Sequence, residues 1–287
     1  MRVLYCLIPI SLFATAGTYE TSLEQWRQKY EASLRADDGW LSVAALGWLH
    51  EGDNRIGSDP ASAVVLPPSA PKNAGIVSLH EGTASFTAAV GVKILINGGL
   101  ASHANLAPDT APLPDRIQIG DLRAMLIRRG ARYGLRVRDP HALTRVHFTG
   151  LHWFPPNEQY RVKARFVAYN PPRKIPITNV LGDTENEECP GYAEFQLHGR
   201  IYRLEPVVES PTELFFMFRD ETSRAETYAS GRFLTTPLAQ DGELVIDFNH
   251  ARNPPCAFTQ FATCPIPPKQ NRMLTRVEAG EKRYGLH

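Results

Sequence analysis

The segments Gly75-Ile76-Val77-Ser78-Leu79 and Ala84-Ser85-Phe86-Thr87 are short runs of strand-forming residues separated by a polar turn. Similar runs follow or precede them, such as Ala63-Val64-Val65-Leu66 and Val92-Lys93-Ile94-Leu95-Ile96. Strand-like runs with turn signals about every eight to twelve residues are typical of β-sandwiches and barrels. The sequence therefore predicts a mainly β protein.

The composition narrows the class of protein further. A length of 287 residues corresponds to about two domains. With 43% apolar and 21% charged residues, the chain is typical of a soluble globular protein. The 23 prolines and 21 glycines favour many turns and few long helices. A formal net charge of +1 gives no indication of nucleic-acid binding.

The first residues have the pattern of an export signal. Arg2 precedes the apolar run 3–13, and Ala14-Thr15-Ala16 has the small-x-small pattern of a cleavage site. We therefore expect a signal peptide over residues 1–16 and a secreted or periplasmic protein with no transmembrane segment after cleavage. The alternative interpretation of this run is a buried N-terminal strand.

One amphipathic helix is expected after the signal segment. Thr21-Ser22-Leu23-Glu24 has the form of a capping box. Apolar residues then recur every three or four positions, at Leu23, Trp26, Tyr30 and Leu34. This pattern predicts a helix from about Ser22 to Arg35 whose apolar stripe covers a neighbouring sheet.

The domain organisation follows from these elements. We expect the helix within residues 17–37, an N-terminal β domain over residues 38–142 and a C-terminal β domain over residues 143–287. The predicted fold is thus mainly β, an N-terminal helix followed by two β-sandwich or barrel-like units packed together.

Arginines are concentrated near the end of the first β domain. Residues 124–140 predict a hairpin whose second strand turns Leu135 and Val137 inward and Arg136 and Arg138 outward. Two interpretations of these charges remain open, a solvated strand face and a groove that binds an anion. The arginines between Asp121 and Arg145 are Arg123, Arg128, Arg129, Arg132, Arg136, Arg138 and Arg145.

In the second half, residues 193–197 and 201–204 predict a hairpin around a His198-Gly199 turn. Residues 214–218 are all apolar and residues 244–248 are apolar except for Asp247, and both runs predict central strands covered on both faces. Polar residues follow both runs directly. Charged groups at the edge of an apolar core are often part of a functional site.

Three hypotheses for this polar region remain open. The first is a pocket for a small polar or anionic ligand; the second is a hydrolase, with or without a metal; the third is a structural or interaction module without catalysis. The candidate catalytic residues are Asp220, Asp247 and His250. The candidate ligand-binding residues are Arg219, Tyr228, Arg232, Asn249 and Arg272.

The cysteines leave two alternatives. Cys256 and Cys264 form a disulfide if the compartment is oxidising, which leaves Cys189 unpaired, or they are buried free thiols. No C-x-x-C spacing points to a structural zinc site. The acidic loop 183–188 lacks the spacing of a calcium loop and is interpreted as solvated. The sequence assigns no cofactor and no oligomeric state.

Several of the polar blocks carry a resemblance to a known family. They include Phe218-Arg219-Asp220, Asp247-Phe248-Asn249, Asn253-Pro254-Pro255-Cys256-Ala257-Phe258 and Ala262-Thr263-Cys264-Pro265. From about Phe148 to Tyr284 the chain resembles the bacterial family known as domain of unknown function 1684. The resemblance implies that these blocks belong together, and it implies no activity.

A second resemblance lies in the first β domain. Arg55-Ile56-Gly57-Ser58-Asp59-Pro60, Val64-Val65-Leu66 and Ile96-Asn97-Gly98 resemble, in order and spacing, a forkhead-associated β-sandwich. In that family a phosphate-binding arginine follows the first glycine, whereas Ser58 stands there in this chain. The resemblance therefore implies a sandwich fold without phosphothreonine binding.

Overall fold

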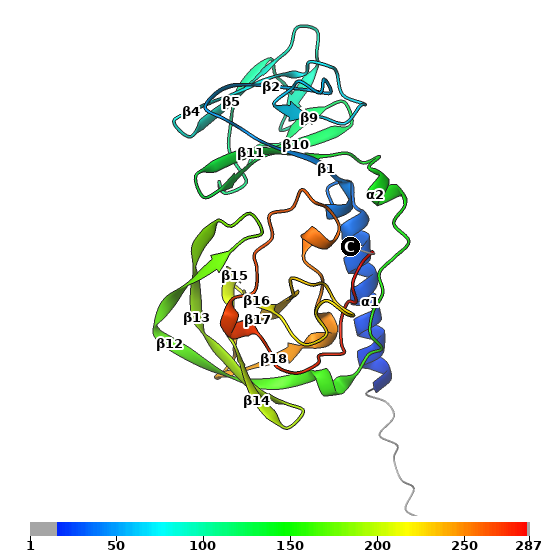
Figure 1. Ribbon diagram of the computed structural model, residues 1–287, viewed down its shortest axis with the longest axis vertical. Coiled ribbons are helices and arrows are strands. Elements are labelled where there is room, and N and C mark those ends of the chain that lie inside the picture. The colour runs from blue at the N-terminus through cyan, green and yellow to red at the C-terminus, as the bar shows by residue number, and fades with distance from the viewer. Residues whose placement is uncertain (1–15, 286–287) are drawn as a thin grey trace, which may run out of the picture.

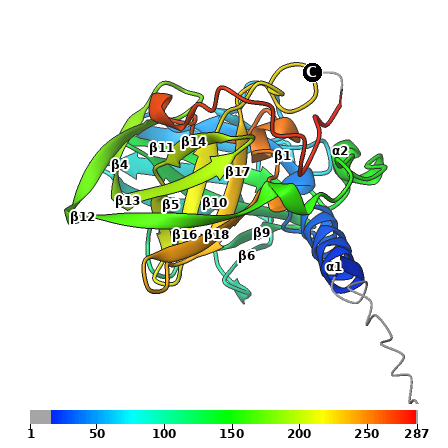
Figure 2. The same ribbon diagram turned by 90° about the horizontal axis from the view of Figure 1, so that it is seen from below.

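The computed structural model describes residues 16–285 and places them in two β units with one long helix beside the second (Figures 1 and 2). The expected signal peptide falls on residues 1–16, of which 1–15 lie outside the described residues. No helix within the described range is long and apolar enough to cross a membrane.

The long helix α1 spans Ala16–Arg35, so it begins several residues earlier than the sequence pattern predicts. The predicted capping box was wrong, because Thr21 lies inside the helix and its hydroxyl donates to the carbonyl of Gly17 at 2.6 Å. Leu23 and Leu34 are buried, as the apolar stripe predicts. The stripe packs on connecting segments of the second β unit rather than on a sheet: Leu34 shares a cluster with Phe148 and Phe258.

The N-terminal unit is a sandwich of two sheets. The six-stranded sheet contains, in order, β1 (Val43–Trp48), β11 (Arg132–Arg138), β10 (Leu122–Arg129), β9 (Ile117–Ile119), β6 (Ile94–Ile96) and β7 (Gly99–Leu100). The five-stranded sheet contains β3 (Val64–Val65), β2 (Gly52–Gly57), β4 (Gly75–His80), β5 (Thr83–Ala88) and β8 (His103–Leu106). Residues of both sheets, such as Phe86 and Leu135, form one buried core.

The C-terminal unit also pairs two sheets. The four-stranded sheet has the order β14 (Arg200–Leu204), β13 (Thr184–Leu197), β12 (Arg161–Thr178) and β18 (Glu243–Asp247). The three-stranded sheet has the order β15 (Val207–Ser210), β16 (Glu213–Phe218) and β17 (Arg232–Pro237). Phe195 and Ile246 of one sheet meet Phe216 of the other in a second core. Among the described strands no sheet closes into a barrel.

Several short helices lie in the connecting segments. They are η1 (Trp40–Ser42), α2 (Leu143–Val146), η2 (Glu158–Tyr160), η3 (Phe248–His250), η4 (Pro255–Ala257) and η5 (Lys269–Asn271). Three of them, η3, η4 and η5, lie in the irregular segment after β18.

Both predicted hairpins are confirmed. Strand β10 pairs with β11 across Gly130, and β13 pairs with β14 across His198 and Gly199, which adopt positive φ angles of 49° and 75°. The central position predicted for residues 214–218 is confirmed, because β16 lies between β15 and β17. The same prediction for residues 244–248 was wrong, because β18 is an edge strand and Val245 on it is exposed.

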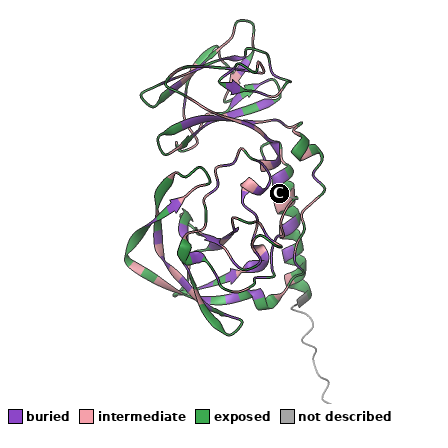
Figure 3. Ribbon diagram, in the orientation of Figure 1, coloured by how far each residue is buried: buried purple, intermediate pink, exposed green. Residues whose placement is uncertain are grey.

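The hairpin of β12 and β13 reaches from the second unit to the first. Its middle, residues 170–174, is exposed, whereas its tip contacts the β10–β11 turn (Figure 3). There, the backbone N–H of Gly130 donates to Glu185 Oε1 at 3.0 Å, and Arg132 forms an ion pair with Asp183. The acidic loop interpreted as solvated is thus partly a contact between the two units.

Candidate functional site

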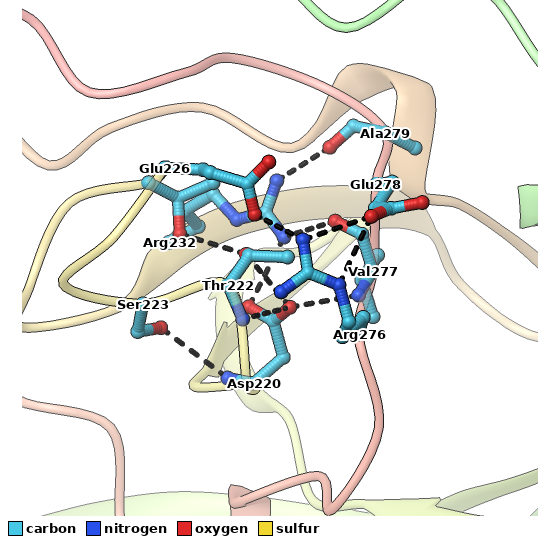
Figure 4. A network of polar contacts seen from close by, with 10 residues as sticks. Asp220, Thr222, Ser223, Glu226, Arg232, Arg276, Val277, Glu278 and Ala279 are labelled. Carbon is cyan, nitrogen blue, oxygen red and sulfur yellow. Dashed lines mark hydrogen bonds and ion pairs between the residues drawn. The ribbon is translucent and has the colours of Figure 1, made fainter.

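Asp220 and Arg232 form the most deeply buried ion pair among the described residues (Figure 4). Arg232 Nη2 donates to Asp220 Oδ1 at 3.1 Å, and neither side chain has any exposed surface. Arg232 also donates to the carbonyls of Val277 and Ala279. Asp220 Oδ2 accepts from the Thr222 hydroxyl at 2.8 Å and from the Val277 backbone at 2.8 Å.

This network ties β16 and β17 to the C-terminal segment and is closed to solvent. The structural hypothesis therefore describes Asp220 and Arg232 best, since an ion pair with these hydrogen bonds holds a fold together without presenting a group to a ligand.

The other ligand-binding candidates lie apart from this pair. Arg219 and Arg272 are neighbours through a backbone bridge, and Arg272 is exposed. Tyr228 is half-buried, and its pKa is raised by burial and by the nearby thiols of Cys256 and Cys264.

Asp247, Asn249 and His250 form a separate cluster with Tyr19 of α1. The Tyr19 hydroxyl lies 2.8 Å and 3.0 Å from the two carboxylate oxygens of Asp247. Asn249 donates to Asp247 Oδ1 through its amide nitrogen at 3.0 Å, and His250 Nδ1 lies 3.2 Å from Asp247 Oδ2. Burial opposes ionisation of Asp247, but the hydrogen bonds from His250 and Asn249 outweigh it, so the net pKa is lowered.

The Asp247 cluster borders a cavity of about 250 Å³ beside β17 and β18. His250 and Arg161 line this cavity together with Thr235. The ring of His250 also packs edge-on against Trp26, at a centroid distance of 4.5 Å. The structure thus joins two of the three predicted catalytic residues, Asp247 and His250, whereas Asp220 belongs to the buried network.

A larger cavity of about 320 Å³ lies between the two β units. The first unit and its entry segment contribute Trp40 and Arg129, and the hairpin of β12 and β13 contributes Glu187. The segment after β18 contributes Thr263 and Cys264. Apolar side chains such as Trp40, Ile177 and Phe233 share the walls with Arg129 and with three carboxylates, Asp183, Glu185 and Glu187, so the cavity has both apolar and charged walls.

Arg136 lies next to this cavity, against Trp40 and Thr263, and is a buried arginine without a carboxylate partner. It is only 5% exposed, and within residues 16–285 no carboxylate lies within ion-pair distance of it. Its guanidinium lies over the Trp40 ring and makes one long hydrogen bond, 3.4 Å, to Thr263 Oγ1, whereas Nε has no partner. Burial and the neighbouring charges of Arg129 and Arg138 lower the pKa of Arg136 to about 10.

This finding corrects the prediction for strand β11. Leu135 and Val137 point into the core as expected, but Arg136 does not face solvent. Trp40 and the segment containing Thr263 cover that face of the strand.

Cys256 and Cys264 are free thiols in the structure, which is the second of the two alternatives that the sequence left open, and Cys264 lines the cavity between the units. The backbone N–H of Cys256 donates to Cys264 Sγ at 3.1 Å, which brings the two residues into direct contact. Cys189 is fully buried elsewhere, donates to the Gly191 carbonyl, and has its pKa raised to about 11 by burial. No cluster of three or more potential metal ligands occurs among the described residues.

The second half of the chain is similar to a family of known proteins. Residues 146–282 match the model of the family described as "Protein of unknown function (DUF1684)". This segment is similar to the DUF1684 family. The match agrees with the resemblance seen in the sequence blocks, and the family description names no activity.

Solved structures give weaker similarities. One is the solution structure of an uncharacterised protein from Haloarcula marismortui, at 31% identity and a TM-score of 0.40, over 48% of this chain and 78% of that chain. Another is the FHA domain of FhaA, at 17% identity and a TM-score of 0.24, over 33% of this chain and 98% of that chain. No curated protein matches the chain.

The cavity between the units includes residues that the sequence analysis did not assign to a site. Trp40 lines the cavity and Arg136 lies beside it, and both precede the segment that matches DUF1684, whereas Thr263 lies inside that segment. One signal in the sequence pointed to this arrangement, the high density of arginines in β10 and β11, for which an anion-binding groove was the second interpretation. Thr263, which contacts Arg136, is 127 positions further along the chain, and no pattern in the residues around Thr263 indicates this contact.

Proposed function

We propose that the protein binds a small polar or anionic ligand in the cavity between its two β units. The observation that carries this proposal is Arg136, a guanidinium that is 5% exposed and has no carboxylate partner. A buried charge without a counter-ion is costly, and a bound anion offsets that cost. The proposal replaces the pocket expected around Arg232, whose hydrogen bonds are already directed to protein groups.

Two carboxylates at the cavity are engaged with protein groups, since Asp183 pairs with Arg132 and Glu185 accepts from the N–H of Gly130. The remaining groups fit such a ligand. Arg129 is held by Asp109 at 2.9 Å and directs its Nε toward Thr263 Oγ1 at 3.0 Å. Glu187 lines the cavity and has no side-chain hydrogen bond or ion pair within the described chain. A ligand with an anionic group and a hydrogen-bond donor therefore finds an unpaired partner for each. Trp40 and Phe233 supply apolar contact area.

A thermal-shift experiment tests this function. Inorganic phosphate, sulfate and small carboxylic acids are titrated against the wild type and Arg136→Met, with Arg123→Met, an exposed arginine, as the matched control. At least one anion is expected to raise the melting temperature of the wild type and the control in a saturable manner, but not that of Arg136→Met. Equal shifts in all three proteins would exclude the site.

A second candidate function rests on the contact between Asp247 and His250. A carboxylate that holds Nδ1 of an imidazole leaves Nε2 available as a general base, and His250 borders the smaller cavity. We propose hydrolysis of a small ester or phosphoester there as the alternative. It predicts turnover of a chromogenic ester or phosphate ester by the wild type and its loss in His250→Gln. Turnover that survives in His250→Gln rejects this alternative.

We also propose that the protein is exported. The proposal rests on the apolar run 3–13 followed by Ala14-Thr15-Ala16. Cleavage after Ala16 retains Tyr19 and with it the contact to Asp247. N-terminal sequencing of protein from the periplasm or medium is expected to begin at Gly17. Protein that stays in the cytoplasm with residues 1–16 intact contradicts export.

A further inference from the structure

We propose that Cys256 and Cys264 form a redox-active dithiol that exchanges with small-molecule disulfides. The two residues are in contact, since the N–H of Cys256 donates to Cys264 Sγ at 3.1 Å. Cys256 is partly exposed, whereas Cys264 is 5% exposed and lines the cavity between the units. The pair therefore combines an accessible sulfur with a protected one, as a stepwise exchange requires.

The surroundings favour one thiolate in the pair. The hydrogen bond from the Cys264 thiol lowers the pKa of Cys256, and the charge of Arg136 lowers it further. The same hydrogen bond and burial raise the pKa of Cys264, and the opposing effect of the Arg136 charge is smaller. A thiolate is the attacking form in disulfide exchange, and a positive group nearby stabilises it. The buried guanidinium that lacks a carboxylate partner is thus also placed to support this chemistry.

The exchange has two steps. The Cys256 thiolate attacks one sulfur of a disulfide R–S–S–R, a Cys256–S–R bond forms, and one R–S⁻ leaves and takes up the proton lost by Cys256. Cys264 then loses its proton and attacks Cys256 Sγ, which releases the second thiol. In total, two protein thiols are oxidised to one disulfide and one small disulfide is reduced to two thiols.

The cavity sets the preference among substrates. Arg129 lines the cavity and Arg136 lies beside it, against Thr263, and we therefore expect faster exchange with disulfides that carry carboxylates than with neutral ones. This preference rests on the anion site proposed above, whereas the exchange itself does not.

Intact-mass spectrometry of the reduced protein with oxidised glutathione, an anionic probe, tests the proposal. The wild type is expected to form an internal disulfide, and Cys264→Ser is expected to accumulate one mixed disulfide on Cys256. Cys256→Ser is expected to lose this fast reaction. Cys189→Ser, the matched control at a buried thiol, is expected to behave as the wild type.

The outcomes separate the two proposals. If oxidised glutathione and the neutral 2-hydroxyethyl disulfide both react through Cys256 at equal rates in the wild type, the dithiol activity stands and the anion preference fails. If neither reagent modifies Cys256 faster than it modifies Cys189, or if Cys264→Ser traps no mixed disulfide although it remains folded by circular dichroism, the dithiol proposal is overturned.

Discussion

Arg232 and Asp220 meet at 3.1 Å with no exposed surface on either side chain, whereas Arg136, which is 5% exposed, has no carboxylate partner. The two arginines therefore have different physical roles. Arg232 donates to Asp220 and to backbone carbonyls of the C-terminal segment, which stabilises the second β unit. Nε lacks a hydrogen-bond partner in both arginines, so the difference is the counter-ion: Arg136 lies between the units without a carboxylate partner, which leaves its charge available to a bound anion.

The buried pair predicts a large stability effect. Asp220→Asn leaves the Arg232 charge without its counter-ion and is expected to cost about 3–5 kcal/mol of unfolding free energy. The exposed pair of Glu226 and Arg276 is the control, and Glu226→Gln is expected to cost less than about 1 kcal/mol. Urea denaturation measures both values. Similar small losses in the two variants would show that the buried pair is not structural.

The hydrogen bond from Tyr19 to Asp247 links α1 to the second β unit and is expected to contribute to stability. Tyr19→Phe removes the hydroxyl that donates to Asp247 and is expected to cost about 1–2 kcal/mol. Because the hydrogen bond from Tyr19 contributes to the lowered pKa of Asp247, the variant is also expected to raise that pKa. NMR titration of the Asp247 carboxyl carbon measures the second effect. An unchanged pKa contradicts the contact.

The buried carboxyl group of Glu281 is expected to make the stability of the protein depend on pH. Burial raises its pKa from 4.5 to about 8, against hydrogen bonds from Asn253 and the charge of Arg232. Between these two values the folded protein binds more protons than the unfolded chain, so stability is greatest below about pH 4.5 for this group and falls as the pH rises through about 8. Denaturation at several pH values is expected to show this fall in the wild type and its reduction in Glu281→Gln. A fall of equal size in the variant assigns it to another group.

Local patterns were sufficient to predict much of the fold. The hairpins around Gly130 and around His198 and Gly199 follow from strand alternation and turn residues within about ten positions. The mainly β class follows in the same way. The start of α1 was missed because the Thr21 pattern has the form of a cap, although the hydroxyl bonds inside the helix to Gly17.

The site depends on contacts that no local pattern specifies. Period-two alternation correctly separates Val137 from Arg136 on opposite faces of β11, but it does not tell whether water or another segment covers the second face. In the same way, Asp220 follows the apolar strand β16 and Asp247 ends the strand β18, yet of these two only Asp247 lies beside a cavity. The edge position of β18 and the burial of β16 decide this difference.

The most direct test of the anion site is a crystal structure of the protein with selenate, whose selenium is located by anomalous scattering. We expect a selenate in the cavity between the two units, in hydrogen-bond contact with Arg136 and Thr263, and no selenate there in Arg136→Met. Selenate bound only at exposed arginines such as Arg123, and not at the Arg136 guanidinium, would show that Arg136 does not bind anions.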